Sequence, residues 1–295
     1  MTQKKAPAPH LSDHEFNEIQ ALIESRSGIL FDSSRERFFS MHLREHMRDC
    51  RLANGSELLR AMNASNVEYD AVIERLLTQE TSFFRYPAVY DALEKRVLPE
   101  MHVKKFWENP RSMRIWSAGC ATGEEPYSIA IALADTLMFA DAWNIEVLAT
   151  DISQEALKFA ERGLYPRRSL EGMSSKRIEA HFMHKDDQYQ VKPRIRKMVT
   201  FAPMNLARSV YVGRMDCIFC MNVMIYFSEA RRSALIQRFF DYLEPGGYLF
   251  LGHSESIARV PVKFQAIVLG DCILYRKPSA DSVQRLEPAM VEERS

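Results

Sequence analysis

Two hydrophobic patterns divide this chain near residue 110. Before that point apolar residues recur every three or four positions, as Phe16 and Ile19 do, which predicts a series of amphipathic helices. Beyond it, short apolar runs alternate with segments of helical period, which predicts a parallel sheet covered by helices. The last helix before that point, at about residues 88–106, connects to the sheet, so we expect a helical domain over residues 11–90 and an α/β domain over residues 91–277.

The second predicted helix, over residues 34–51, carries a basic face. At about 100° per residue, four arginines fall within an arc of about 60°: Arg37, Arg44, Arg48 and Arg51. A solvated surface is the usual explanation of such a face. Because few acidic residues lie among these arginines, the face would also suit an acidic helical partner. Both interpretations stay open.

The α/β half contains predicted strands, joining helices and one interruption. The strands are expected at residues 113–118, 144–150, 198–202, 216–221, 248–253 and 265–276. A turn is expected at residues 244–247, between the last long helix and the strand that follows it. Between residues 163 and 197 the alternation stops, and a short helix and a hairpin predict a small inserted β-subdomain.

The clearest candidate for a ligand site is the segment IWSAGCATGEEPYS, residues 115–128. An apolar strand leads into a turn framed by Gly119 and Gly123 and then into a helix, so backbone N–H groups can approach a ligand. Asp151 ends the next strand, where an acidic residue can accept hydrogen bonds from two ribose hydroxyls. Glu124 and Glu125 open the helix and would repel a diphosphate, so the charge favours S-adenosylmethionine over a nicotinamide dinucleotide.

Other polar residues fall at the same predicted edge of the sheet. Gly119, Asp151, Asn205 and Asn222 all follow strand ends, and open α/β sheets bind their ligands beyond the carboxyl ends of the strands. No helix is expected between the last strands, so one of them should run antiparallel. This pattern predicts the Rossmann-like, seven-stranded sheet of class I S-adenosylmethionine-dependent methyltransferases.

Composition limits the remaining classes of function. The 39 basic and 39 acidic residues balance, which argues against a general nucleic-acid binder. The sequence contains no apolar run of membrane-spanning length and no signal peptide, so we expect a cytoplasmic monomer without membrane insertion. The ends, residues 1–10 and 278–295, are polar and are expected to be disordered. Cys217 and Cys220 lie on one predicted strand and point to opposite faces, so we expect free thiols and no metal site.

Several motifs, in this order, resemble those of one family. They are TSFFR (81–85), WSAGCATGEEPYSIA (116–130), TDIS (150–153), NL (205–206), FCMNVMIYF (219–227) and GHSE (252–255). Over residues 11–277 the chain resembles the chemotaxis receptor glutamate methyltransferases, the CheR family. The resemblance implies S-adenosylmethionine as methyl donor, S-adenosylhomocysteine as product, and the cytoplasmic helical domain of methyl-accepting chemotaxis receptors as partner. It also implies a helical domain joined to a methyltransferase sheet with a β-subdomain.

The resemblance further implies which residues form the site. Cofactor contacts are expected from Thr81, Arg85, Glu125, Asp151, Asn205, Leu206 and Asn222, beside the loop of Gly119. Arg85 and Tyr226 resemble the residues near the transferring methyl group, and Glu125 is preferred over Glu124. Two cofactor-lining positions depart from the family pattern. Gln79 replaces an asparagine and Met221 replaces an arginine, which removes a charge from the pocket.

Three functions are compatible with these residues. The first is methylation of receptor glutamates, whose carboxylates are ionised at neutral pH and need no general base. The second is a methyltransferase with another protein target or an RNA target, and the zero net charge counts against RNA. The third is a cofactor-binding regulatory module that lost activity through Gln79 and Met221. Arg85, Asn222 and Tyr226 favour an active enzyme over that module.

Overall fold

The computed structural model describes residues 9–30, 35–77, 80–257 and 260–279. Gln79 lies outside the described residues, as do residues 1–8 of the predicted disordered lead and residues 280–295 of the predicted disordered tail. The helices are α1 (Asp13–Ser27), α2 (Glu36–Asp49), α3 (Gly55–Ala64), α4 (Asn66–Leu76), α5 (Pro87–Ala92), α6 (Leu98–Lys105), α7 (Glu124–Thr136), α8 (Gln154–Arg162), α9 (Ser175–His181), α10 (Pro193–Arg196) and α11 (Glu229–Tyr242). A π-helical turn, Leu93–Val97, joins α5 to α6.

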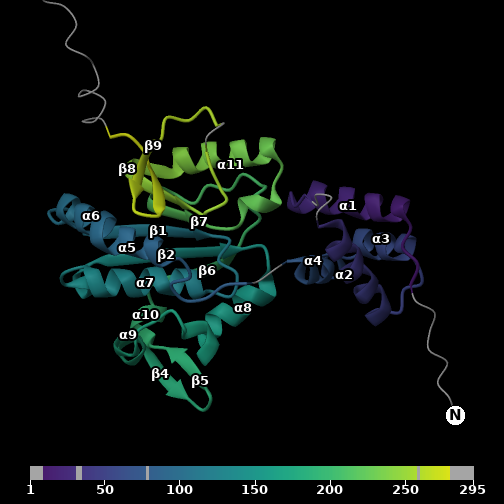
Figure 1. Cartoon of the computed structure of the whole chain (residues 1–295), viewed down its shortest axis with the longest axis horizontal. Coiled ribbons are helices and arrows are strands. Elements are labelled where there is room, and N and C mark those ends of the chain that lie inside the picture. The colour runs from purple at the N-terminus through teal and green to yellow at the C-terminus, as the bar shows by residue number, and fades with distance from the viewer. Residues whose placement is uncertain (1–8, 31–34, 78–79, 258–259, 280–295) are drawn as a thin grey trace, which may run out of the picture.

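Helices α1 to α4 pack around a core of their own beside the sheet (Figure 1). Helix α1 begins with a capping box, in which the Ser12 hydroxyl accepts the N–H of Glu15 and the Glu15 carboxylate accepts the N–H of Ser12. It ends at Gly28, whose φ of 81° is the left-handed conformation that glycine adopts without strain. The boundaries of α1 therefore have a local cause in its capping residues.

The prediction for the basic face of α2 was wrong at one residue. Helix α2 ends at Asp49, and Arg51 lies beyond it with a φ of 58°, so the helical spacing does not place this side chain. Beyond the end of a helix, the rotation of about 100° per residue no longer determines which way a side chain points. Arg37, Arg44 and Arg48 do lie on α2, and their side chains are exposed.

The main sheet has seven strands in the order β6-β2-β1-β7-β8-β10-β9. They are β1 (Ser112–Ala118), β2 (Asn144–Asp151), β6 (Val199–Pro203), β7 (Met215–Cys220), β8 (Leu243–Leu251), β9 (Gln265–Leu269) and β10 (Cys272–Arg276). The first five in this order are parallel, and β10 is antiparallel to both β8 and β9. This is the predicted class I methyltransferase sheet with its antiparallel edge.

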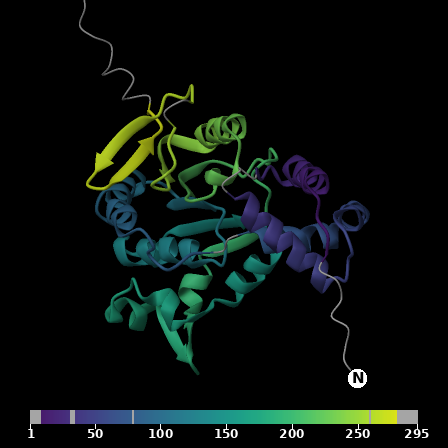
Figure 2. The same cartoon turned by 45° about the vertical axis from the view of Figure 1, so that its right-hand side comes forward.

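Residues of β7 alternate between the two faces of the sheet. Cys217 and Phe219 join the core beneath α5, α6 and α7, whereas Ile218 and Cys220 join the core beneath α11. Figures 1 and 2 show α7 and α11 on opposite faces of the sheet. All six residues of β7 are buried, as expected for a central parallel strand.

Two local predictions at the end of the sheet were wrong. The segment 244–247, where a turn was expected, is part of β8. Met215 of β7 pairs with Leu243 and Cys217 pairs with Tyr248, so β8 has extra residues between these two pairs, and they form an irregularity inside the strand. The predicted strand 265–276 is a hairpin of β9 and β10. Gly270, with a φ of 56°, lies in the turn between them.

A second sheet of three strands, in the order β3-β5-β4, is built from the segment where the alternation stops. Its strands are β3 (Leu164–Pro166), β4 (Phe182–Lys185) and β5 (Gln188–Val191). The predicted hairpin is β4 and β5, and β3 was not predicted because three residues give no readable period. Arg177 of α9 links this subdomain to the rest by ion pairs with Asp135 of α7, at 2.9 Å, and with Glu94, at 2.7 Å.

Among the described residues, every helix is too short or too polar to cross a membrane.

Candidate functional site

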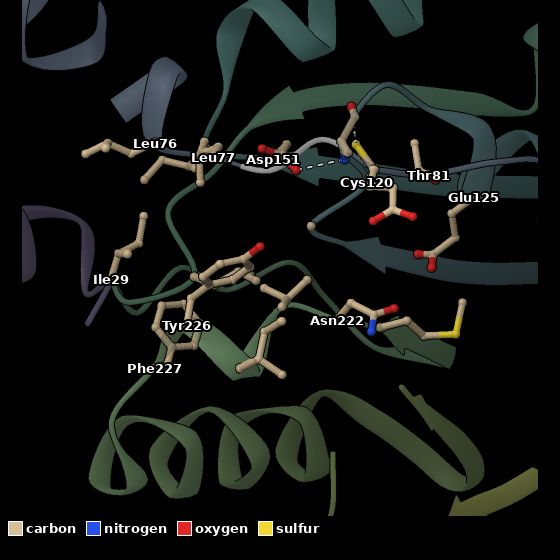
Figure 3. A pocket seen from close by; sticks show the side chains of 18 of the residues that line it. Ile29, Leu76, Leu77, Thr81, Cys120, Glu125, Asp151, Asn222, Tyr226 and Phe227 are labelled. Carbon is tan, nitrogen blue, oxygen red and sulfur yellow. Dashed lines mark hydrogen bonds between the residues drawn. The ribbon is translucent and has the colours of Figure 1, made fainter. Parts of the chain in front are cut away.

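A cavity of about 510 Å³ lies where the carboxyl ends of β1, β2, β6 and β7 face the helical domain (Figure 3). Its volume is in the range of pockets that hold cofactors and other small molecules. Helices α2 and α4 contribute Phe38, Phe39 and Leu76 to its wall. The helical domain therefore forms the wall of the cavity opposite the strand ends. The site therefore needs both parts of the chain.

The loop after β1 is tied down by backbone hydrogen bonds. The N–H groups of Gly119 and Cys120 both donate to the carbonyl oxygen of Thr150 at the end of β2, at 2.8 and 3.0 Å. Gly119 has a φ of 89°, and a Cβ atom there would lie 2.3 Å from the Cγ2 atom of Val223. Only glycine combines this conformation with this close approach, so Gly119 fixes how the loop passes the cavity.

Asp151 joins the glycine loop to helix α8 through its carboxylate. Oδ2 accepts the N–H of Ala121 at 2.8 Å, and Oδ1 accepts the N–H of Ser153 at 2.9 Å. Burial raises the pKa of Asp151, while these two backbone hydrogen bonds lower it. Each oxygen keeps a further lone pair, so the carboxylate can also accept hydrogen bonds from a ligand in the cavity.

The two glutamates at the start of α7 point to different places. Glu125 lines the cavity and accepts a hydrogen bond from the Ser117 hydroxyl at 2.7 Å, whereas Glu124 does not line it. Glu124 instead accepts hydrogen bonds from the hydroxyls of Thr122, at 2.6 Å, and Ser169, at 3.3 Å. Burial raises the pKa of Glu125 to about 7, with a smaller contribution from the charge of Glu255. A bound cation would stabilise the ionised form of this carboxyl group.

Asn222 is held in place by a carboxylate that sequence reasoning did not assign to the site. Glu255 accepts hydrogen bonds from the N–H groups of Asn222 (2.9 Å), Met224 (2.7 Å) and Gly252 (2.8 Å). These bonds hold the segment after β7, where Asn222 has a left-handed φ of 63°. The Tyr86 hydroxyl donates to the Asn222 side-chain oxygen at 2.6 Å.

Asn205 connects the sheet to the helical domain. Its side-chain nitrogen donates to the carbonyl oxygen of Arg26 at 2.8 Å, and its side-chain oxygen accepts the N–H of Ala207 at 2.8 Å. Leu206, which is buried, follows it in the cavity wall. Asn205 therefore positions this wall in addition to bordering the cavity.

Arg85 and Tyr226 both line the cavity, but they differ in their contacts with neighbouring residues. The Arg85 guanidinium hydrogen-bonds the Glu80 carbonyl oxygen and lies 3.6 Å from the Glu80 carboxylate. Tyr226 stacks beneath the Arg35 guanidinium, 4.7 Å from the ring centroid. Its hydroxyl has no hydrogen-bond partner among the described residues, so it is free to donate to a ligand.

The cavity brings together the following residues predicted for the site: Thr81, Arg85, Gly119, Glu125, Asp151, Asn205, Leu206, Met221, Asn222 and Tyr226. Gln79 lies outside the described residues, and the arginines of the basic face lie on the surface. The sequence did not predict that Glu255 and Tyr86 hold Asn222 in position. The motif GHSE contains Glu255, but its contact with the segment after β7 arises only when the sheet forms.

Comparison with known proteins gives one consistent result. The model of the family "CheR methyltransferase, SAM binding domain" matches residues 79–271. The chain is 35% identical to the chemotaxis protein methyltransferase of Escherichia coli strain K12, over 90% of each chain. It is 33% identical to that of Vibrio parahaemolyticus, over 90% of this chain and 98% of the relative. It is 32% identical to chemotaxis protein methyltransferase 1 of Pseudomonas aeruginosa, over 89% and 97%.

Proposed function

Because the chain belongs to the CheR methyltransferase family and is an S-adenosylmethionine-dependent methyltransferase, we propose that it methylates glutamate side chains of chemotaxis receptors in the cytoplasm. The products are glutamate methyl esters and S-adenosylhomocysteine. The observation that supports the proposal is that the motif residues of the sheet converge on one cavity with Glu80, Thr81, Ser82, Arg85 and Tyr86. A cofactor and a protein carboxylate can meet there.

The donor groups around the cavity fit S-adenosylmethionine. The half-buried carboxylates of Asp151 and Glu125 suit a ligand with hydroxyl groups and positive charge, and they oppose a diphosphate. Asp151 would hold the ribose hydroxyls, Glu125 the ammonium group, and Leu206 the adenine. Met221 supplies apolar contact at the position where a charge was expected, so carboxylate recognition is left to the other residues of the wall.

S-adenosylmethionine supplies a methyl group activated by the positive sulfonium. The protein's part is to align the substrate carboxylate with that group and to exclude water from it. Arg85 binds the carboxylate after exchanging its contact with Glu80, and the Tyr226 hydroxyl donates a hydrogen bond to it. Both contacts should be weak, since a strongly held anion is a poorer nucleophile. No proton needs to be removed from an ionised glutamate.

The basic face of α2 is the proposed contact with the receptor. Arg37, Arg44 and Arg48 make no side-chain ion pair within the described part of the chain, and Arg51 follows them beyond the helix end. Arg35 and Phe38, at the start of the same helix, line the cavity. An acidic receptor helix lying along these arginines would therefore present its glutamates close to Arg85.

The deciding experiment is methyl transfer from labelled S-adenosylmethionine to membranes that carry chemoreceptors, followed by treatment with base. Volatile label released by base is expected, because carboxyl methyl esters hydrolyse to methanol. Base-stable label would contradict glutamate methylation. Cofactor binding without any transfer to receptors would favour the regulatory module.

Charge reversal tests the receptor contact. Arg44→Glu with Arg48→Glu should lower the rate of transfer to receptors at least tenfold and leave the Kd for S-adenosylmethionine unchanged. The matched control is Arg60→Glu with Lys158→Glu, which changes the net charge equally at two exposed positions elsewhere. Equal rates for the two double variants would show that the basic face does not bind the receptor.

A further inference from the structure

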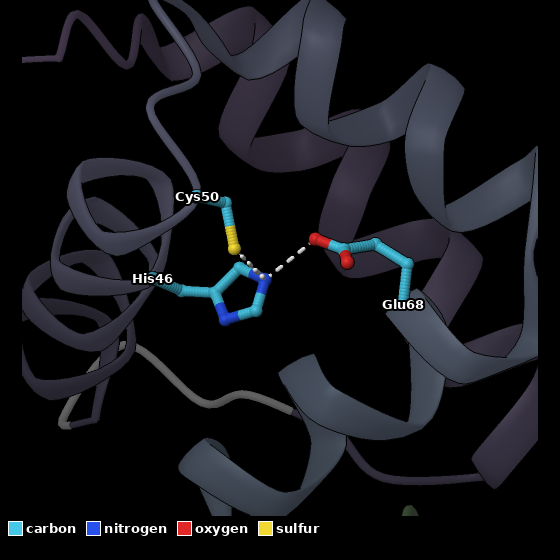
Figure 4. A group of neighbouring side chains, drawn as sticks. All are labelled: His46, Cys50 and Glu68. Carbon is cyan, nitrogen blue, oxygen red and sulfur yellow. Dashed lines mark hydrogen bonds and ion pairs between the residues drawn. The ribbon is translucent and has the colours of Figure 1, made fainter.

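A second cluster of reactive side chains lies in the helical domain (Figure 4). His46 and Cys50 are four residues apart on one side of the end of α2, and Glu68 comes from the first turn of α4. The Nε2 atom of His46 lies 2.7 Å from Oε1 of Glu68 and 3.6 Å from Sγ of Cys50. An imidazole, a thiol and a carboxylate, each a ligand type for zinc, thus converge on one point.

Hydrogen bonding alone leaves this cluster incompletely satisfied. One proton on Nε2 of His46 can be donated to Glu68, and the Cys50 thiol, which Nε2 then cannot accept, interacts with the same carboxylate. The Nδ1 atom of His46 is buried and has no hydrogen-bond partner among the described residues. The ring is therefore oriented by its packing and by the contacts at Nε2.

The distances agree with tetrahedral coordination. Zn–N bonds of about 2.0 Å and Zn–S bonds of about 2.3 Å, at a tetrahedral angle, separate nitrogen and sulfur by about 3.5 Å. The separation of Nε2 and Sγ is 3.6 Å. The corresponding nitrogen–oxygen separation is about 3.3 Å, so Glu68, whose side chain is 25% exposed, needs to move by only about half an ångström from its present 2.7 Å.

We propose that Nε2 of His46, Sγ of Cys50 and a carboxylate oxygen of Glu68 bind one Zn²⁺ ion, with water as the fourth ligand. On binding, the thiol releases its proton to solvent and the neutral imidazole carries its one proton on Nδ1, so the bound thiolate, carboxylate and metal are electrically neutral together. Cys50 is exposed and gives the ion a path to the site, while His46 is 3% exposed and holds it from the inside. No other such group of three occurs within the described ranges.

The site would clamp α2 to α4 at a distance from the cavity. Phe39 and Leu76 border the cavity at the opposite ends of these two helices. Cys50 follows Phe39 by 11 residues, which is about 16 Å along a helix. The ion therefore takes no part in methyl transfer. Its expected effect is to stabilise the pair of helices that carries the basic face and closes the cavity.

The test is a titration of the metal-free, full-length protein with Zn²⁺ in competition with a chromogenic chelator. One equivalent should bind, and Cys50→Ser and Glu68→Gln should each weaken binding at least tenfold. Co²⁺ at the same site should give the intense absorption of tetrahedral coordination with a thiolate charge-transfer band, which Cys50→Ser should remove. Zn²⁺ should also raise the Tm of the native protein but not that of Cys50→Ser.

The controls separate this site from adventitious binding. Glu45→Gln removes an exposed carboxylate beside His42 on the same helix, and Cys272→Ser removes a thiol elsewhere, and both should bind Zn²⁺ as the native protein does. The Tm of each variant without metal shows that it folds. Failure of the native protein to bind one equivalent, or equal binding by Cys50→Ser, would overturn the proposal.

Discussion

The pKa of Glu125 predicts two opposite effects of one substitution. Glu125 lies in the cavity wall, and burial raises its pKa from the ordinary value of 4.5 to about 7. Glu125→Gln keeps the size of the side chain and the acceptor for the Ser117 hydroxyl, and it removes the charge. The variant should unfold less readily than the native protein at neutral pH and should bind S-adenosylmethionine more weakly.

The effect on stability follows from linkage. Because folding raises this pKa, the folded protein binds more protons than the unfolded chain between pH 4.5 and 7, so its stability falls as the pH rises through this window. Each pKa unit corresponds to about 1.4 kcal/mol, which gives a loss of about 3 kcal/mol by pH 7.5. Glu125→Gln does not incur this loss. Its free energy of unfolding without cofactor should match the native value at pH 4.5 and exceed it by up to 3 kcal/mol, roughly, at pH 7.5.

The effect on binding has the opposite sign. If the ionised form binds the ammonium group, the apparent Kd rises as the ionised fraction falls. With a pKa of about 7, that fraction falls about 25-fold between pH 7.5 and pH 5.5. Between these two pH values the Kd of the native protein should rise by this factor more than the Kd of Glu125→Gln does. The variant still contains Asp151, so it corrects for the titration of Asp151.

Urea unfolding at several pH values and isothermal titration calorimetry measure the two quantities. Equal stability of the two proteins at pH 7.5 would show that Glu125 is not destabilised by burial. Equal pH dependence of the two Kd values would show that its charge does not bind the cofactor. Either result would refute the corresponding part of the reasoning, and the two parts can fail separately.

Three further substitutions test the geometry of the cavity. Gly119→Ala forces a left-handed residue against Val223 and should lower the free energy of unfolding by about 2 kcal/mol; Val223→Ala should restore part of that loss in urea unfolding. Glu255→Gln removes the negative charge of a carboxylate that accepts hydrogen bonds from three backbone N–H groups. It should lower the free energy of unfolding by about 2 kcal/mol, and an unchanged urea midpoint would contradict this. Tyr226→Phe removes a hydroxyl that has no partner within the described segments, so stability and cofactor Kd should be unchanged while kcat for receptor methylation falls about tenfold; an unchanged kcat would remove Tyr226 from the reaction.

Most of the site was predictable because its residues follow strand ends. Gly119, Asp151 and Asn222 are each preceded by a short apolar run, and in a parallel sheet the carboxyl ends of such strands meet at one edge. The capping residues of α1 likewise gave its boundaries, since a capping box is a contact between residues three apart. Local chemistry is sufficient where the partners are close in sequence.

Other features were decided by contacts between distant residues. Glu255 reaches Asn222 across 33 positions, and Asn205 reaches Arg26 across 179, and no periodicity in the chain indicates such pairs. The same holds for the two glutamates of α7, since only the packing against Ser117 and Ser169 shows which of them faces the cavity. The expected edge strand became a hairpin at Gly270, because a long apolar segment does not reveal where it folds back.

By itself, then, the sequence determined the order of the elements, the edge of the sheet that forms the site, and most of the residues that line it. These depend on hydrophobic period and capping, which act within a few residues. The tertiary structure alone decided how the helical domain closes the cavity, which carboxylates line it, and that His46, Cys50 and Glu68 meet. Those outcomes depend on burial and on side chains brought together from separate elements, and burial is a property of the folded chain.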